Sequence, residues 1–286
     1  MNYISQQAIS QFIDQSLHED VGDGDHTSAS SIPSEATGEA QLIIKGQGIL
    51  AGMELAEKIF HQINPHLELK ILLHDGDRVK NGDIALRVKG SVHSILKAER
   101  LVLNCMQRMS GIATLTHELT EIIRGTGARL LDTRKTTPNF RMMEKWAVAI
   151  GGGTNHRFGL FDMILLKDNH VDYAGGISKA IQSARNYLQK TGKNLPIEIE
   201  TRNLQEVQEA LQTGGIDRIM LDNMPVDMIK EALAMINKQY QTEASGGITR
   251  ESILEIARTG VDYISVGALT HSIKSMDMSL KAVRGL

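Results

Sequence analysis

The residues best suited to chemistry in this 286-residue sequence follow a series of short apolar runs in its second half. In parallel α/β folds, the active site is assembled at the carboxyl ends of the strands. A single polar exit would be ordinary solvation of a loop, but six in succession predict a shared site. The exits are Asp132–Thr137, Lys167–His170, Glu198 with Glu200, Asp222-Asn223, Ser245–Gly247 and Ser265–Ala268.

Two of these exits, Ser245-Gly246-Gly247 and Ser265-Val266-Gly267, are glycine loops that follow the last two runs. Glycine lets backbone N–H groups approach a phosphate closely, and a helix N-terminus adds a favourable field. Barrel enzymes frequently bind phosphate after their final strands. Glycine also makes simple tight turns, but the two positions together favour a phosphate site.

Basic residues accompany the exits. Arginine offers a planar fork that fits a carboxylate or phosphate, whereas lysine acts as a movable point charge. Surface salt bridging is the alternative interpretation. Against it, cations that converge at one end of a sheet repel one another unless an anion joins them. The basic group consists of Arg100, Arg134, Lys135, His156, Arg157 and Lys167.

Acidic residues form a second group. Glu198 and Glu200 are two residues apart on one predicted strand and therefore point to the same face. If that face lines a barrel, they lie with Asp222 beside the basic group. Such carboxylates can hold sugar hydroxyls and Mg²⁺, or stabilise positive charge that develops on a carbon. The alternative is that they only neutralise Lys167 and Arg134.

The apolar runs that position these residues alternate with helical patterns such as Ile177–Gln189, Leu204–Gln212 and Pro225–Asn237. This alternation implies parallel strands joined by right-handed crossovers. Six strands are fewer than the eight of a full TIM barrel, so a closed and an incomplete (β/α) barrel both remain open. A doubly wound sheet is the structural alternative. The predicted strands are Ala128–Asp132, Phe161–Leu166, Pro196–Ile199, Ile216–Leu221, Tyr240–Ala244 and Val261–Val266.

Two further helices are predicted near the basic residues. Thr137-Pro138 predicts an N-cap followed by proline in the first helical turn, with the helix ending at the triple glycine Gly151–Gly153. From about Ser94, apolar residues at three- and four-residue spacing predict a long buried helix that extends to Ile123. Gly111 is predicted to interrupt or bend it.

The first part of the sequence differs in its pattern of apolar runs and turn residues. Short β-rich runs, Ala40–Lys45, Leu67–Leu73 and Ile84–Val88, are separated by turn signals. The change comes near residue 108 and predicts two domains, 1–108 and 109–286. We expect the C-terminal tail of the second domain to pack back on the first.

Bulk composition limits the function classes. A hydrophobic content of 41% is ordinary for a globular protein, and a formal charge of -3 gives no field that would favour nucleic acid or a membrane surface. The single cysteine, Cys105, excludes an intrachain disulfide framework and fits a reducing compartment. No apolar run approaches the ~18 residues of a membrane helix. We therefore expect a cytoplasmic protein.

Several motifs resemble the quinolinate phosphoribosyltransferases, also called nicotinate-nucleotide pyrophosphorylases (carboxylating). The resemblance covers nearly the whole chain, with no departure at a motif position. The most specific segments are AERLVLNCMQRMSGIAT, LLDTRKTTPNFRMMEKWAVAIGGGTNHRFGLFDMILLKDNH, DRIMLDNM and EASGGIT.

The resemblance implies an N-terminal α/β sandwich domain on an incomplete (β/α) barrel, assembled as a homodimer or a set of dimers. It implies Mg²⁺-dependent transfer of phosphoribosyl from 5-phosphoribosyl 1-pyrophosphate (PRPP) to quinolinate. The products would be nicotinate mononucleotide, pyrophosphate and carbon dioxide, as in NAD biosynthesis.

The family motifs also imply roles for individual residues. Arg134, His156, Arg157 and Lys167 would bind the quinolinate carboxylates beside Thr133, and Arg100 would reach the site from the partner subunit. The catalytic group would be Lys135 at the phosphates with Glu200 and Asp222 at the ribose and metal. Glu198 could exchange roles with Glu200. The phosphate group would comprise Lys135, Lys167, Ser245, Gly246, Gly247, Ser265, Val266, Gly267 and His271.

Two rival functions are weighed against this one. A related phosphoribosyltransferase acting on nicotinate or another pyridine acid would need fewer cations, because nicotinate carries one carboxylate. A non-catalytic phosphosugar-binding protein would lack the acidic residues, yet Glu200 and Asp222 are both present.

Overall fold

The computed structural model describes residues 3–283, which form two compact units. The first unit comprises the described residues up to His117, Thr136–Gly152, and those from Leu269 onward. The second unit comprises Glu118–Lys135 and Gly153–Ala268. The chain therefore passes between the units more than once.

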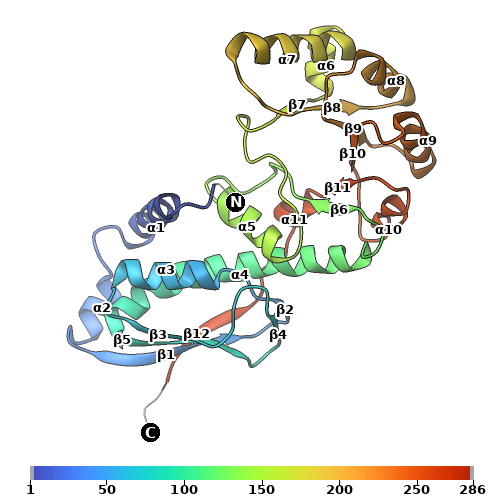
Figure 1. Cartoon of the computed structure of the whole chain (residues 1–286). Helices are drawn as coiled ribbons and strands as arrows, with labels where there is room; N and C mark the ends of the chain where they lie inside the picture. Colours follow the sequence, from blue (N-terminus) through green and yellow to red (C-terminus); the bar gives the residue numbers. More distant parts are fainter. Residues whose placement is uncertain (1–2, 284–286) are drawn as a thin grey trace. The chain divides into compact units, whose positions relative to one another are not determined.

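The first unit is an antiparallel sheet with helices (Figure 1). The sheet has the strand order β12-β1-β5-β3, so the C-terminal strand β12 pairs with β1. A two-stranded sheet, β2-β4, accompanies it. The elements are α1 (Gln6–Val21), α2 (His26–Ser31), β1 (Thr37–Ile44), β2 (Gly48–Ile49), α3 (Met53–Ile63), β3 (Glu68–Ile71), β4 (Arg78–Val79), β5 (Ile84–Ser91), α4 (Val92–Ile122, which ends in the second unit), α5 (Arg141–Ile150), α11 (Ala268–His271) and β12 (Met278–Ala282).

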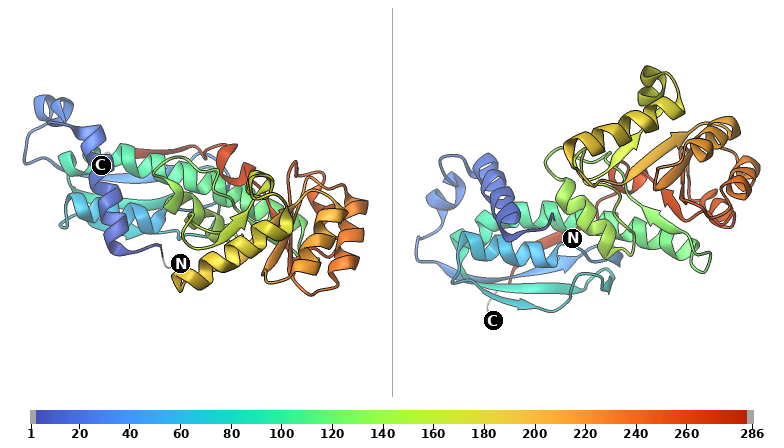
Figure 2. Two further views of the ribbon diagram at one scale, coloured as in Figure 1. Left: turned by 90° about the horizontal axis from the view of Figure 1, so that it is seen from above. Right: turned by 45° about the horizontal axis from the view of Figure 1, so that its top comes forward.

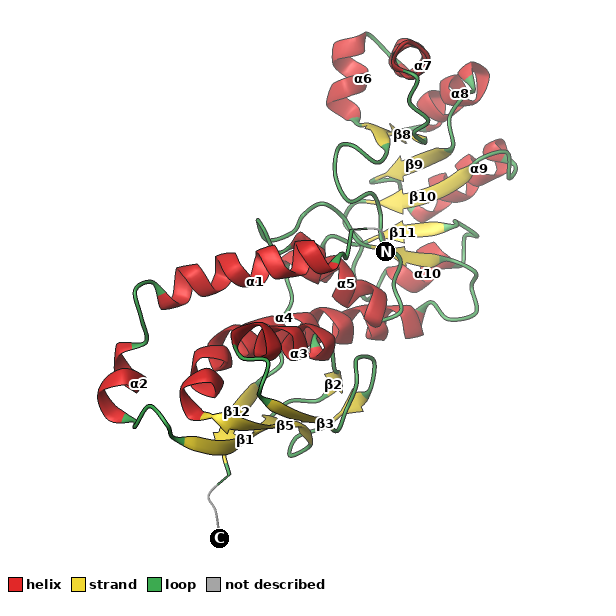
Figure 3. Ribbon diagram, turned by 60° about the vertical axis from the view of Figure 1, so that its left-hand side comes forward, coloured by secondary structure: helices red, strands yellow, loops and turns green. Residues whose placement is uncertain are grey.

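Helices α3 and α4 lie along one face of this sheet (Figures 1 and 3). Alternate residues of β1, such as Leu42 and Ile44, are buried, and α3 buries Leu55, Ile59 and Phe60. Each such side chain contributes roughly 1.5–3 kcal/mol when fully buried. This arrangement confirms an N-terminal α/β sandwich.

Helix α4 passes through Gly111, so of the two predictions made there, an interruption or a bend, the interruption was wrong. A Cβ atom on Gly111 would lie 2.3 Å from the carbonyl oxygen of Lys274 and 3.2 Å from the Cα of Ser275. The glycine is needed because the segment before β12 approaches the helix closely, not because the helix ends.

The predicted N-cap at Thr137 was also wrong, because α5 begins at Arg141. Asn139 adopts a left-handed conformation with a φ of 62°, which interrupts a helix started at Pro138. The segment forms a turn instead, in which the N–H of Phe140 donates to the carbonyl of Thr137.

The second unit is a parallel sheet of six strands in the order β6-β11-β10-β9-β8-β7, with helices along its outer side (Figure 2). Helix α7 contacts α8 and α8 contacts α9, which gives the helical layer. The elements are β6 (Arg129–Leu131), β7 (Ile164–Leu166), α6 (Asp168–Ala174), α7 (Ile177–Thr191), β8 (Ile197–Thr201), α8 (Leu204–Thr213), β9 (Arg218–Asp222), α9 (Val226–Ile236), β10 (Gln241–Ser245), α10 (Ile253–Ala257) and β11 (Tyr263–Ser265).

The six predicted strands are all present, although β7 begins later than expected. Asp162 accepts the N–H groups of Phe158 and Gly159 and turns the chain just before this strand. Strands β6 and β7 are the two edges of the described sheet and do not pair with each other. The second unit is therefore an incomplete (β/α) barrel, one of the two forms left open by the sequence.

Every residue of β8 is buried, including Glu198 and Glu200. A strand that is covered on both faces is typical of a parallel sheet, but two buried acids need partners.

Among the described residues, no helix combines the length and the apolar character that crossing a membrane requires.

Candidate active site

A cavity of ≈ 320 Å³ opens in the second unit at the carboxyl ends of the strands. This volume suits a small molecule. Eight of the predicted site residues line the cavity, and three further residues, Leu165, Met220 and Glu243, complete the lining. The eight are Thr133, Arg134, Lys135, His156, Arg157, Lys167, Ser245 and Ser265.

Arg134 and Arg157 both line this cavity, and their positive charges repel each other. Burial, and then the positive charge of Arg134, lower the pKa of Arg157. Arg157 is oriented by a hydrogen bond of 3.2 Å from its Nη1 to the carbonyl of Met163. Because like charges repel, an anion placed beside both guanidinium groups would be bound favourably.

Lys167 and Glu200 form an ion pair at the edge of the cavity. The Nζ of Lys167 lies 2.9 Å from the Oε2 of Glu200, and the lysine side chain remains 47% exposed whereas the glutamate is 6% exposed. The Oε1 of Glu200 accepts the N–H of Asp168 at 3.3 Å. The lysine can therefore still reach a ligand, while the carboxylate is held in place.

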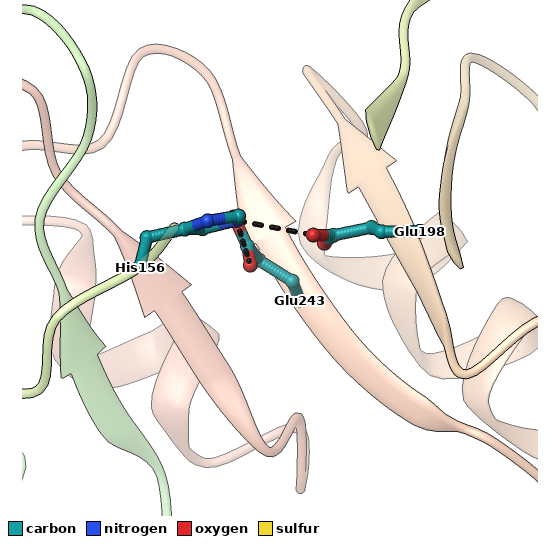
Figure 4. A group of neighbouring side chains, drawn as sticks. All are labelled: His156, Glu198 and Glu243. Carbon is teal, nitrogen blue, oxygen red and sulfur yellow. Dashed lines mark ion pairs between the residues drawn. The ribbon is translucent and has the colours of Figure 1, made fainter. Parts of the chain in front are cut away.

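Glu198 lies deeper on the same strand and has different partners (Figure 4). The Nε2 of His156 lies 3.0 Å from Glu198 and 3.3 Å from Glu243. The Nη1 of Arg218 lies 3.0 Å from Glu243 and 3.8 Å from Glu198. The two acids of β8 face the same side as predicted, but only Glu200 is at the strand end.

These buried groups could be considered a metal site, because ligand atoms of His156, Glu198 and Glu243 lie within 4.8 Å of one another. However, the Arg218 guanidinium already supplies positive charge to both carboxylates, and it stacks 4.2 Å from the ring centroid of Tyr263. The cluster is therefore a buried ion-pair network rather than a metal cage.

The ring of His156 is fixed at both nitrogens. Its Nδ1 accepts the N–H of Arg157 at 2.6 Å, so the Nε2 carries the proton that points at the two glutamates. Desolvation lowers the pKa of His156, but the hydrogen bonds and charges of Glu198 and Glu243 outweigh it and raise the pKa to about 9.

The loop that carries His156 is positioned by Asp132, a buried residue at the end of β6. Its carboxylate accepts the N–H of His156 at 2.9 Å and the side-chain amide of Asn155 at 2.6 Å. An isolated bridge between Leu131 and Thr154 adds backbone pairing to the same loop. Asp132, which belongs to the first predicted strand exit, therefore positions the loop that carries His156 and Arg157 of the basic group.

Asp222 ends β9, and the first glycine loop follows β10. Burial, and then the negative charge of Glu200, raise the pKa of Asp222, whereas hydrogen bonds from Asn223 and Ser245 oppose this shift. Gly246 has a φ of +88°, and a Cβ there would lie 2.2 Å from the side chain of Asn223. The glycine is thus required for the loop to pack against the end of β9, which brings Ser245 to Asp222.

The second glycine loop begins with a residue whose backbone pairs with a neighbouring strand. The N–H of Val266 donates to the carbonyl of Leu131 at 3.0 Å, and the valine side chain is buried. The backbone N–H of Val266 therefore serves the pairing of β11 with β6, and its assignment to the phosphate group stays a prediction. Ser265 lines the cavity and hydrogen-bonds Glu243.

Two predicted residues belong to the first unit. Arg100 is exposed on α4 and lines a separate cavity of ≈ 480 Å³ together with Glu19 and Asp20. His271 ends α11, where its Nδ1 lies 2.6 Å from the Oγ of Ser272. Neither residue is among those that line the cavity of the second unit.

Comparison with known proteins identifies similar sequences and structures. Residues 25–110 match the family described as "Quinolinate phosphoribosyl transferase, N-terminal domain", and residues 112–281 match the corresponding "C-terminal domain". The chain is 48% identical over 284 residues to "Quinolinate phosphoribosyltransferase (decarboxylating) 1b" of Nicotiana tabacum, covering 94% of this chain and 81% of that protein.

A bacterial relative and a solved structure agree with this match. The "probable nicotinate-nucleotide pyrophosphorylase (carboxylating)" of Bacillus subtilis is 42% identical over 262 residues, covering 92% of this chain and 89% of that protein. The structure of the nicotinate-nucleotide pyrophosphorylase from Francisella tularensis superposes with a TM-score of 0.90 at 38% identity and covers 98% of each chain.

Proposed function

The chain belongs to the quinolinate phosphoribosyltransferase family, and we propose that it transfers phosphoribosyl from PRPP to the ring nitrogen of quinolinate. Nicotinate mononucleotide, pyrophosphate and carbon dioxide are the products, as in NAD biosynthesis. The observation that carries the proposal is the ≈ 320 Å³ cavity in which Arg134, Arg157 and Lys167 converge. A pyridine dicarboxylate offers two negative charges to these cations.

In this proposal, the cationic side chains bind the carboxylates of quinolinate. Arg134 and Arg157 bind one or both carboxylates through their planar forks, because each fork matches carboxylate geometry. The exposed ammonium of Lys167 completes the charge balance. Thr133 and the ring of His156 line the same cavity and orient the pyridine. The Nε2 of His156 points at Glu198 and Glu243, so we assign this residue to the wall rather than to the charged clamp.

PRPP occupies the other part of the cavity in this proposal. Lys135 meets the phosphates, and Glu200 and Asp222 meet the ribose hydroxyls. Hydroxyl and backbone donors of the two glycine loops bind the 5′-phosphate, with His271 as a further candidate. The phosphate group in this proposal is Lys135, Lys167, Ser245, Gly246, Gly247, Ser265, Val266, Gly267 and His271.

The chemistry follows from the charges. As the bond between C1 of the ribose and pyrophosphate breaks, positive charge develops on C1, and Glu200 and Asp222 favour it. Lys135 stabilises the departing pyrophosphate. The quinolinate nitrogen forms the new bond to C1 with its own lone pair, so no general base is required. The positive charge of the resulting pyridinium stabilises the electron pair left on C2 of the ring when the carboxylate at C2 leaves as carbon dioxide, and C2 then takes up a proton from water. The arginine clamp holds the quinolinate nitrogen close to C1 of PRPP, and this proximity accounts for much of the rate.

Mg²⁺ fits the acidic half of the site. Carboxylate oxygens are ligands that this ion prefers, and it is usually held by one or two carboxylates together with substrate phosphates. Asp222, whose pKa is raised by burial and by Glu200, would gain a compensating positive charge from a cation. When bound with PRPP, the ion neutralises negative charge on the pyrophosphate, and Glu200 and Asp222 are the residues that would hold it.

Further parts of the proposal concern assembly and location. We assign the chain to a homodimer, or an assembly of dimers, in which Arg100 of one protomer completes the quinolinate site of its partner. The exposed position of Arg100 on α4 is compatible with this role.

Cys105 is buried, and burial raises the pKa of its thiol to about 12, so it is unreactive. A reducing, cytoplasmic location suits it.

A mixing experiment tests the shared site. Arg100→Ala and Lys135→Ala proteins are each expected to be nearly inactive alone, but a mixture should regain up to about one quarter of native activity, because random exchange gives half heterodimers with one intact site each. Subunit exchange is followed by mass spectrometry of differently tagged chains. Proven exchange without recovered activity would contradict the shared site.

The activity itself is tested by product analysis. Incubation with PRPP, Mg²⁺ and quinolinate should yield nicotinate mononucleotide, pyrophosphate and carbon dioxide in equal amounts. Binding of PRPP without any turnover would instead support the non-catalytic phosphosugar-binding function.

A further inference from the structure

A buried ion pair in the first unit joins helices α4 and α5. The Nε of Arg108 donates to the Oε1 of Glu144 at 2.7 Å, and the glutamate side chain is 0% exposed whereas the arginine is 30% exposed. The Oε2 of Glu144 accepts the backbone N–H of Thr137 at 3.3 Å. Both oxygens of this buried carboxylate are therefore used, one of them by a backbone group outside the two helices.

The same guanidinium reaches two further segments. The Nη2 of Arg108 donates to the Oγ1 of Thr137 at 3.0 Å and to the carbonyl oxygen of Thr270 at 2.9 Å. A single side chain thus binds α5, the turn before α5, and helix α11. Arginine is suited to this task because its donors are fixed in one plane.

The two attached segments directly continue the proposed PRPP-binding segments. Thr137 follows Lys135 by two residues, and Thr270 follows Gly267 by three and Ser265 by five. Lys135 and Ser265 line the cavity, whereas Arg108 and Glu144 do not. The chain that leaves each phosphate-binding segment is therefore hydrogen-bonded to Arg108 within five residues of that segment.

We propose that Arg108 and Glu144 are positioning residues for PRPP: together they fix Thr137 and Thr270, and through them the backbone that carries Lys135 and the Ser265–Gly267 loop. The proposal rests on the proposed function, because it assigns PRPP to those two segments. Displacements of about 1 Å in a substrate-binding group can cost on the order of 100-fold in rate.

A purely structural role is the alternative, in which the pair only joins α4 to α5. Replacing the ion pair by apolar side chains of similar size distinguishes the structural role from the positioning role, because such a replacement is often neutral or stabilising for the fold. The attachments to Thr137 and Thr270 are lost in that variant, whatever happens to stability.

The first test is therefore the double variant Arg108→Met/Glu144→Leu. We expect thermal unfolding close to that of the native protein. The KM for PRPP and its Kd, measured by calorimetry with Mg²⁺, should rise by roughly tenfold or more, while the KM for quinolinate changes by less than about threefold. The matched control is Glu39→Leu/Arg87→Met, which removes the Arg87–Glu39 pair of β5 and β1 in the same unit and should leave both KM values unchanged.

The second test is a smaller change that spares the ion pair. Thr137→Val removes only the hydroxyl that accepts from Arg108, whereas Thr137→Ser keeps it. Valine should raise the Kd for PRPP by several-fold, and serine should restore the native value. This comparison decides the matter if the double variant does not fold, since Thr137 is exposed.

Native PRPP affinity in a folded double variant, or equal affinities for the valine and serine variants, would overturn the positioning role. So would an equal rise in both KM values. A failure of the proposed function looks different: Lys135→Ala and Ser265→Ala would then leave PRPP binding unchanged, even if the Arg108 variants bind it poorly.

Discussion

An Arg134→Ala variant is expected to bind quinolinate on the order of 10–100-fold more weakly than the native protein, while PRPP binding changes little. The reason is the loss of a charged hydrogen bond in a partly desolvated cavity, which is worth roughly 1.5–3 kcal/mol. Arg157 lies within reach of the Arg134 charge, so one member of the clamp would remain. Calorimetric titration with each substrate separately measures both affinities.

The control for this variant is Arg124→Ala. Arg124 is 72% exposed and pairs with Glu121 outside the cavity, so its removal should alter neither affinity. Equal losses of quinolinate and PRPP binding in Arg134→Ala would contradict its assignment to the dicarboxylate. Unchanged quinolinate binding would remove it from the site altogether.

An Asp222→Asn variant should lower kcat by about 10²–10³, the size of effect seen when one preorganised group that stabilises transition-state charge is removed. The fold should be retained, because the amide can keep a hydrogen bond to Ser245. The matched control is Asp227→Asn on α9, whose carboxylate is 91% exposed and pairs with Lys230. That change should leave kcat unaffected.

The pH profile gives a second measure of Asp222. Burial and the Glu200 charge raise the pKa of Asp222, and the role proposed for this residue requires its ionised form. Activity should therefore fall as pH decreases through this raised pKa. Glu200→Gln removes the negative neighbour, lowers the pKa of Asp222, and should move the acidic limb of kcat/KM, which reports the free enzyme, to lower pH. A limb that shifts to higher pH, or does not move, would contradict this assignment.

Much of the barrel and its site could be predicted because the signals were local. Each strand of the second unit is an apolar run with its functional residue at the carboxyl end, and a two-residue spacing was enough to place Glu198 and Glu200 on one face. The identities at the strand ends then predicted six of the residues that line one cavity, and two more, His156 and Arg157, come from the loop after the triple glycine.

Other features depend on partners far away in the sequence. Glu243 lines the cavity and binds His156, but a single acid within the run Tyr240–Ala244 gave no sign of its partner. Alternation along that run, which places Glu243 and Ser245 on one face, was the available signal. The role of Arg108 depends on Thr137 and Thr270, the latter 162 residues away.

The errors have the same origin. Thr137-Pro138 has the composition of a helix start, yet Asn139 adopts a left-handed conformation and Thr137 is bound by Arg108 and Glu144. Gly111 serves a close approach by Lys274 rather than a helix break. Each required knowledge of a tertiary neighbour.

The claim that the basic half of the cavity is built for a dicarboxylate is tested most directly by comparing quinolinate with nicotinate as substrates. Nicotinate lacks the carboxylate that would pair with one of the cations, a difference of roughly 1.5–3 kcal/mol. We expect kcat/KM for quinolinate to exceed that for nicotinate by at least about 10–100-fold, with one carbon dioxide released per nucleotide formed. Equal use of nicotinate, or nucleotide formation from quinolinate without carbon dioxide, would contradict this account.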